Sequence, residues 1–260
     1  MSNIKKALWY ELRRDLSVWI LTIACAVIPF FIVFADGEFG DITGTVAAAG
    51  LSGFLPMIVF YYICFTVPQI CWGDLKDKTM NYEVLGGHVR KKVFAARVLV
   101  TYELSMAAVV LPSMVIIALT SVCNGVGGNL TVMEMVSLYG RFFCVTTRLI
   151  AECILFTLLV GSSMNGRMLC PMLEAALAVP VFITNFLLEK EVGGYYSTTY
   201  RLLAVMELGN YRMGFYNGED IVQYIITPDP LGWAMDSVGM LVVTAIILLV
   251  TYLILKKKDI

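Results

Sequence analysis

The stretch VAAAGLSGFLPMIVFYYICFTVPQIC, from Val46 to Cys71, runs directly into WGDLKDKTMNYEVLGGHVRKKVFAAR, from Trp72 to Arg97. The first part exceeds the roughly 20 apolar residues that an α-helix needs to cross the hydrocarbon core of a bilayer. The second part is a dense island of mixed charge that ends in a basic cluster. Together they predict a membrane crossing followed by a polar connection, and the rest of the chain repeats this alternation.

The composition supports a membrane protein. Hydrophobic residues make up 59% of the 260 positions and charged residues 15%, and the mean hydropathy is +0.79, whereas a soluble domain carries roughly a quarter charged residues. Because no water satisfies the backbone at membrane depth, each crossing is expected to be a helix. We therefore predict an all-α integral membrane protein with residues 1–260 as one transmembrane domain.

Six apolar runs are long enough to be crossings, and the second of them, with Pro56 and Pro68, is long enough to be tilted or kinked. The six predicted spans are Val18–Ala35, Val46–Cys71, Val98–Val122, Phe142–Ser163, Leu169–Leu188 and Ser237–Leu255.

Lys and Arg in the connections predict the orientation. Basic residues gather in residues 1–17, in the island 72–97, at Arg167 and in the tail 256–258, which all fall on one side if six spans are correct. The opposite side carries an acidic first loop, Arg141 and the long segment 189–236. The chain is thus expected to be a multi-pass protein of the cell membrane with both termini in the cytoplasm. A cleaved signal peptide is the rival interpretation of the first span, although its apolar run exceeds the usual length.

Two connections are expected to be helical in part. Residues 1–17 alternate basic and apolar positions at helical spacing, which predicts a helix on the membrane surface with basic side chains near anionic headgroups. The alternative is an extension of the first span. Residues 189–236 are rich in Tyr, Leu, Met and Ile and predict short exterior helices before the last span, as a gate or as a packed cap.

Four ionisable residues lie inside apolar runs. Glu103 and Glu174 are only about 8–9 Å from the ends of their spans, within snorkelling range of the cytoplasmic face. Arg148 and Glu152 are deeper and share a helix face, so an ion pair toward the bundle interior is the natural arrangement. Such a pair is either structural or a relay for an ion-coupled transporter.

Enzyme signatures are missing from the sequence. It has no phosphate-binding loop and no dinucleotide fingerprint, and a metal site at its one histidine, His88, would lack companions. The cysteines form no C-x-x-C pair and are best interpreted as small buried hydrophobes, with Cys123 in a predicted exterior loop. We expect no cofactor, no metal, no catalytic residues and no nucleic-acid partner.

The architecture and the stretch DLKDKTMNYEVLGGHVRKKVFAARVL resemble the membrane subunits of type 2 ATP-binding cassette exporters. Those subunits combine a surface-lying N-terminal helix, six spans and a polar connection between spans two and three. In that connection an acidic approach and a short helix precede a Gly, a basic residue and a second basic residue at the entry to span three. These three positions are taken here by Gly87, Arg90 and Arg97. The common Gly-Thr of the family appears here as Lys78-Thr79.

The resemblance implies a coupling helix that docks on a separate ATPase subunit. Its expected residues are Asp74, Leu75, Lys76, Asp77, Lys78, Thr79, Met80, Asn81, Tyr82, Glu83, Val84 and Leu85. It also implies a second permease subunit, identical or sister, and a cargo such as an amphipathic peptide or a lipophilic drug. On composition alone, the island 72–97 could instead be a solvated loop that only fixes the topology.

The sequence therefore leaves three classes of function open. The first is an exporter permease driven by a partner ATPase. The second is an ion-coupled secondary transporter using Arg148 and Glu152, although the paired repeats with broken spans that are typical of such carriers are not found. The third is a membrane protein that transports nothing, such as an intramembrane enzyme or an assembly scaffold.

Overall fold

The structure, a computed structural model, describes residues 2–34, 42–73, 89–127, 132–188 and 230–257, and the regular elements in these ranges are all helices. The chain order is α1 (Ser2–Leu12), α2 (Leu16–Phe34), α3 (Gly44–Trp72), α5 (Arg90–Asn124), α6 (Val132–Val160), α7 (Ser163–Leu188) and α9 (Pro230–Lys257). The prediction of an all-α protein is confirmed for these ranges.

Four segments of the described chain are individually long and apolar enough to cross a membrane: Leu55–Trp72, Arg90–Asn124, Tyr139–Val160 and Ser237–Lys257. A fifth is obtained if α1 and α2, which meet at an angle of 80°, are counted as one bent segment. This confirms a membrane-embedded helical protein. The expected span 169–188 lies in α7, which is not among these segments, so six crossings remain a prediction.

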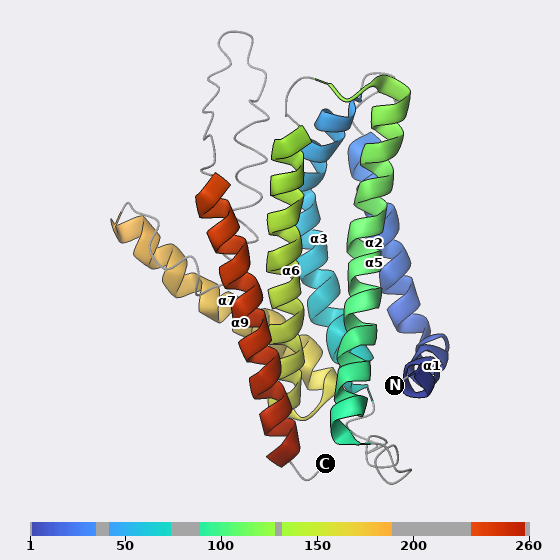
Figure 1. The fold of residues 1–260 in the computed structure, drawn as a ribbon, viewed down its shortest axis with the longest axis vertical. Helices are drawn as coiled ribbons and strands as arrows, with labels where there is room; N and C mark the ends of the chain where they lie inside the picture. Colours follow the sequence, from blue (N-terminus) through green and yellow to red (C-terminus); the bar gives the residue numbers. More distant parts are fainter. Residues whose placement is uncertain (1, 35–41, 74–88, 128–131, 189–229, 258–260) are drawn as a thin grey trace.

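Helix α3 occupies the centre of the bundle, because it packs against α2, α5, α6 and α7. Its buried positions include Val59, Ile63, Val67 and Ile70, which meet side chains of α5 and α6 in one continuous hydrophobic core. Helix α9 packs mainly on α6, and α7 slants away from the other long helices (Figure 1). Pro56 and Pro68 lie within α3.

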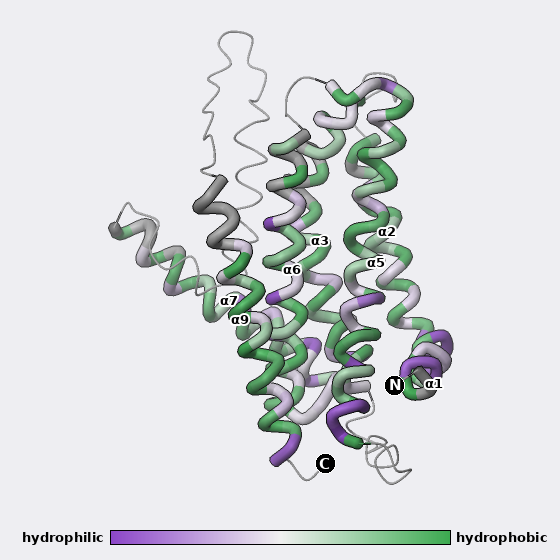
Figure 2. Tube along the Cα trace, in the orientation of Figure 1, coloured by the Kyte–Doolittle hydropathy of each residue, from purple (hydrophilic) through white to green (hydrophobic). Residues whose placement is uncertain are grey.

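One end of the bundle carries most of the described basic residues, and we call it the basic end. Helix α1, the end of α3, the start of α5, the turn between α6 and α7, and the end of α9 all lie there (Figure 1). The hydrophilic residues along the trace are concentrated at the same end, and hydrophobic residues cover most of the helix lengths (Figure 2). The other end, where α3 begins, is called the opposite end.

Helix α1 lies across the basic end with its apolar side on the bundle. Ile4, Leu8 and Leu12 recur every four residues and are all buried in the main core, whereas Tyr10 and Leu16 are exposed. The amphipathic pattern therefore predicted the helix correctly, but its buried side meets protein.

The turn between α1 and α2 is fixed by polar contacts. The Asp15 carboxylate accepts hydrogen bonds from Ser17 Oγ at 2.6 Å and the Ser17 amide at 3.1 Å, and its other oxygen accepts from Gln69 Nε2 of α3 at 2.9 Å. Trp19 Nε1 donates to the Leu12 carbonyl at 2.9 Å. Burial alone would raise the pKa of Asp15, but the hydrogen bonds from Ser17, Gln69 and the Val18 amide outweigh it and lower that pKa.

Several expected loop residues are helical. Residues 90–97 of the island form the start of α5, Arg141 lies in α6 rather than in an exterior loop, and Arg167 lies in α7. The expected exterior segment ends earlier than predicted, because α9 begins at Pro230. In each case the helix continues past the apolar run into a polar or amphipathic stretch.

Candidate functional site

The expected docking segment, Asp74–Leu85, lies outside the described residues, as do Gly87 and His88. The structure does describe the two helix ends that flank it, α3 up to Trp72 and α5 from Arg90. The site is therefore built from these ends and from the charged side chains within the bundle.

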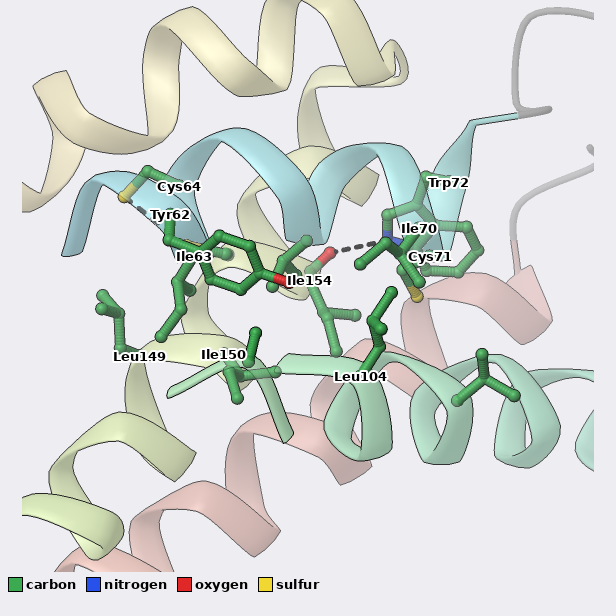
Figure 3. Packing of buried hydrophobic residues seen from close by; sticks show 14 of the residues in the cluster. Tyr62, Ile63, Cys64, Ile70, Cys71, Trp72, Leu104, Leu149, Ile150 and Ile154 are labelled. Carbon is green, nitrogen blue, oxygen red and sulfur yellow. Dashed lines mark hydrogen bonds between the residues drawn. The ribbon is translucent and has the colours of Figure 1, made fainter. Parts of the chain in front are cut away.

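Trp72, the last residue of α3, is fully buried. Its indole Nε1 donates a hydrogen bond to the Ile154 carbonyl of α6 at 2.9 Å, and Figure 3 shows the ring directed from α3 toward that residue. The Trp72 ring also stacks on Phe94 of α5 with ring centroids 6.4 Å apart, and Phe94 meets Tyr252 of α9 at 5.8 Å. Aromatic pairs at such distances add to the burial energy.

Arg97 joins the same two helix ends. Its side chain is only 2% exposed and its Nη1 donates to the Cys71 carbonyl at 3.1 Å. The last carbonyls of a helix lack intrahelical donors and carry partial negative charge, so a guanidinium there completes the end of α3. We call Trp72, Phe94, Arg97, Ile154 and Tyr252 the end clamp, because together they tie both flanks of residues 74–88 to α6 and α9.

The sequence did not predict the end clamp. Trp72 was grouped with the polar island, and Arg97 was interpreted as a charge of that island and as a basic position of the exporter motif. A signal was nonetheless present, since Val93, Arg97, Val100 and Leu104 recur at helical spacing and all are buried. An arginine within such a stripe indicates a charge with a specific partner, because an unpaired buried charge is costly.

Arg148 and Glu152 form an ion pair, as their i, i+4 spacing predicts. Arg148 Nε lies 2.8 Å from Glu152 Oε1, and the two side chains are 7% and 8% exposed. Arg148 Nη1 is also 3.3 Å from the Met240 sulfur of α9. The pair therefore lies at the contact between α6 and α9 inside the bundle.

Glu103 and Glu174, both expected within snorkelling range of the cytoplasmic face, have different surroundings in the structure. Glu103 of α5 forms an ion pair with Lys5 of α1, with side chains 37% and 33% exposed. Glu174 is fully buried, because α7 packs against both α3 and α6. The expectation failed for Glu174, because distance from a span end says nothing about neighbouring helices.

The thiols fit the prediction of small buried hydrophobes. All seven cysteines are free, and six of them are buried while Cys123 is exposed. Cys64 of α3 and Cys153 of α6 have their sulfurs 3.9 Å apart. Across the described ranges, no group of three or more His, Cys, Asp or Glu residues is arranged to hold a metal ion.

Comparison of the chain with protein-family models, curated proteins and solved structures gives no match. The functional argument therefore depends on the geometry of the end clamp and of the buried charges.

Proposed function

We propose that this chain is the membrane-spanning permease subunit of an ATP-binding cassette exporter, driven by a separate ATPase subunit. In this proposal α2, α3, α5, α6, α7 and α9 are the six crossings and α1 is the interfacial helix. The excess of Lys and Arg at the basic end favours a cytoplasmic location for that end, by the positive-inside rule. Both termini would then face the cytoplasm of a cell membrane.

The observation that carries the proposal is the end clamp. A segment that receives force from a partner can act on a bundle only if its flanks are attached to the helices that must move. Trp72 and Arg97 attach the two flanks of residues 74–88 to each other, and the contacts to Ile154 and Tyr252 extend that attachment to α6 and α9. Displacement of Asp74–Leu85 by an ATPase would therefore shift the end of α3 together with α5, α6 and α9, which is how small local movements become global ones.

The proposal includes a second permease subunit, identical or sister, and a cargo that is an amphipathic peptide or a lipophilic compound. Such cargo is consistent with the chain's large lipid-facing apolar surface and with its small number of buried charges. ATP hydrolysis is assigned to the partner, in keeping with the absence of a phosphate-binding loop from the sequence.

An ion-coupled transporter is the second candidate, and the buried pair Arg148–Glu152 is the observation that favours it. A carboxylate relay must exchange its proton with water or cargo during transport. Glu152 instead faces Arg148 at 2.8 Å in a site that is almost closed to solvent. This arrangement supports a structural role of the ion pair more strongly than a role as a proton relay.

The test is co-purification with a candidate ATP-binding cassette ATPase subunit. Replacement of residues 74–85 by a Gly/Ser linker is expected to abolish co-purification. The same replacement of residues 125–131, which connect α5 to α6 in the sequence, is the control and is expected to preserve it. Trp72→Ala, which leaves the docking residues intact, is expected to retain the ATPase while lowering cargo-stimulated ATP hydrolysis. Transport that continues without the ATPase but stops when the proton gradient collapses would contradict the proposal and support the ion-coupled alternative.

A further inference from the structure

Helix α1 carries a basic pocket of about 490 Å³ on its surface. The burial of Ile4, Leu8 and Leu12 in the main core fixes the rotation of the helix about its own axis. With 3.6 residues per turn, positions 6, 10 and 13 are then directed away from that core. The residues that line the pocket are Lys5, Lys6, Trp9, Tyr10 and Arg13.

Three of the lining side chains are held in place by other residues. Lys5 forms an ion pair with Glu103 of α5, and Trp9 is half-buried and packs against the main core. The Tyr10 hydroxyl accepts a hydrogen bond from Arg14 Nη2 at 2.7 Å, and Arg14 Cζ lies 4.6 Å from the centroid of the Tyr10 ring. Because these walls are ordered before a ligand arrives, less entropy is lost when one binds.

The charge of the pocket selects an anionic ligand. Lys6 and Arg13 are exposed, and within the described part of the chain neither of them forms an ion pair. None of the described residues that line the pocket is acidic. The guanidinium of Arg13 has a planar fork that matches the oxygens of a phosphate, and the ammonium of Lys6 adds a compact positive charge. The ligand that complements the pocket is therefore a phosphate group.

The position of α1 selects a lipid as the carrier of that phosphate. Helices α1 and α2 meet at an angle of 80°, so α1 lies nearly parallel to the membrane surface when α2 crosses the bilayer. Leu16 and Ile20, in the first turns of α2, are exposed apolar residues that acyl chains can cover. Trp and Tyr side chains such as Trp9 and Tyr10 are typical of the boundary between hydrocarbon and water. The pocket is thus at the level of the lipid headgroups.

We propose that this pocket binds the headgroup of one anionic phospholipid. Lys6 and Arg13 bind the phosphate oxygens, and the rings of Trp9 and Tyr10 flank the headgroup. Such a site differs from the diffuse attraction of basic residues for a negatively charged surface, because it holds one lipid and depends on these residues rather than on the total charge. The inference involves neither the end clamp nor residues 74–88, so it does not rest on the proposed ATPase.

The experiment uses the full chain in detergent micelles, titrated with phosphatidylglycerol or with phosphatidylcholine that carries the same acyl chains. Native mass spectrometry counts the lipids bound to each chain and gives the affinity of each successive lipid. Both lipids contain a phosphodiester, but only phosphatidylglycerol has a net negative charge. We expect the first phosphatidylglycerol to bind about tenfold more tightly than either the second one or phosphatidylcholine.

Lys6→Gln combined with Arg13→Gln is expected to weaken binding of the first phosphatidylglycerol about 25-fold, because each basic residue near a lipid surface contributes about fivefold. Lys256→Gln combined with Lys257→Gln is the matched control, since it removes two exposed cations at the end of α9, also at the basic end. The control is expected to change the first affinity by less than about twofold. If the first variant loses its helical circular dichroism, Arg13→Gln alone replaces it, with an expected loss of about fivefold.

Equal losses in the two double variants would overturn the proposal, because the lipid would then respond only to total charge. Equal affinities for phosphatidylglycerol and phosphatidylcholine would overturn it as well. Displacement of the first phosphatidylglycerol by inorganic phosphate would assign the pocket to a soluble anion. Unchanged lipid binding with loss of ATPase co-purification in the Lys6/Arg13 variant would assign this surface to a protein partner. Lipid binding is measured without the ATPase, so this proposal and the proposed function fail separately.

Discussion

Substitution of Glu152 by Gln tests the role of the buried charge pair. The change keeps the size of the side chain and its capacity for hydrogen bonding, but it removes the negative charge that lies 2.8 Å from Arg148. Since both side chains are more than nine-tenths buried, neither water nor salt can replace that charge efficiently.

The burial of the Arg148–Glu152 pair determines how large a loss of stability to expect. Removal of one partner from a buried ion pair costs about 3–5 kcal/mol, whereas replacement of both partners by apolar residues of similar volume is often neutral or stabilising. We therefore expect Glu152→Gln to lower the free energy of unfolding by about 3 kcal/mol, the low end because the amide still accepts a hydrogen bond. Combined Arg148→Met and Glu152→Leu is expected to return within about 1 kcal/mol of the native value.

The assay is unfolding in mixed micelles by titration with dodecyl sulfate, followed by the far-ultraviolet circular dichroism of the helices. Glu103→Gln is the matched control, because it removes a carboxylate from the Lys5–Glu103 pair, whose side chains are about one-third exposed. For a pair with that exposure we expect a loss of less than about 1 kcal/mol.

Two results would refute the reasoning. The first is a loss for Glu152→Gln no larger than that for Glu103→Gln, which would mean that burial does not strengthen the pair. The second is a double variant as unstable as the single one. Loss of transport at unchanged stability would instead favour the relay interpretation of Glu152.

Three further predictions concern the packing of the helices. The pKa of Asp15 is lowered in the fold, so the contribution of its carboxylate to holding α1 is complete above the unfolded pKa near 3.8 and is lost as the pH falls through the lower folded pKa. Peptic cleavage of the α1–α2 turn should therefore increase in that acidic window. Asp15→Asn should abolish this dependence on pH. Copper phenanthroline should oxidise the thiols of Cys64 and Cys153, 3.9 Å apart, to a disulfide between α3 and α6, detected as a linked peptide pair that either Ser substitution removes. Gly166→Ala should lower the free energy of unfolding by about 1–3 kcal/mol, since the added Cβ would lie 2.7 Å from Thr157 Cγ2. Thermal melting should show that a second substitution, Thr157→Ala, recovers most of this loss.

The fold was predictable to the extent that hydrophobicity decides it. The expected spans 46–71 and 98–122 lie within α3 and α5, because a run of apolar residues at membrane depth has no alternative to a helix. The helix ends were not predictable in this way. Beyond the apolar run the local preference decides, and basic residues such as Arg90 and Lys91 are good helix formers, so α5 begins eight residues earlier than the apolar pattern indicates.

The candidate site was predictable only where both partners share one helix. Arg148 and Glu152 could be paired from their spacing, since neighbours on a helix face are fixed by the period of the helix. Lys5–Glu103 and Arg97 with the Cys71 carbonyl join different helices, and no local pattern encodes how those helices pack. The burial of Glu174 was missed for the same reason.

Pro68 affects how the last turn of the central helix α3 can move. Proline has no amide hydrogen, so the carbonyl of Cys64 one turn earlier lacks its usual donor within α3. The segment from Gln69 to Trp72 is therefore joined to the rest of α3 by a weaker backbone ladder, while Trp72 itself is bonded to α6. Bending at this proline would let the terminal turn rotate together with α6, and the remainder of α3 could keep its packing against α2 and α7 undisturbed.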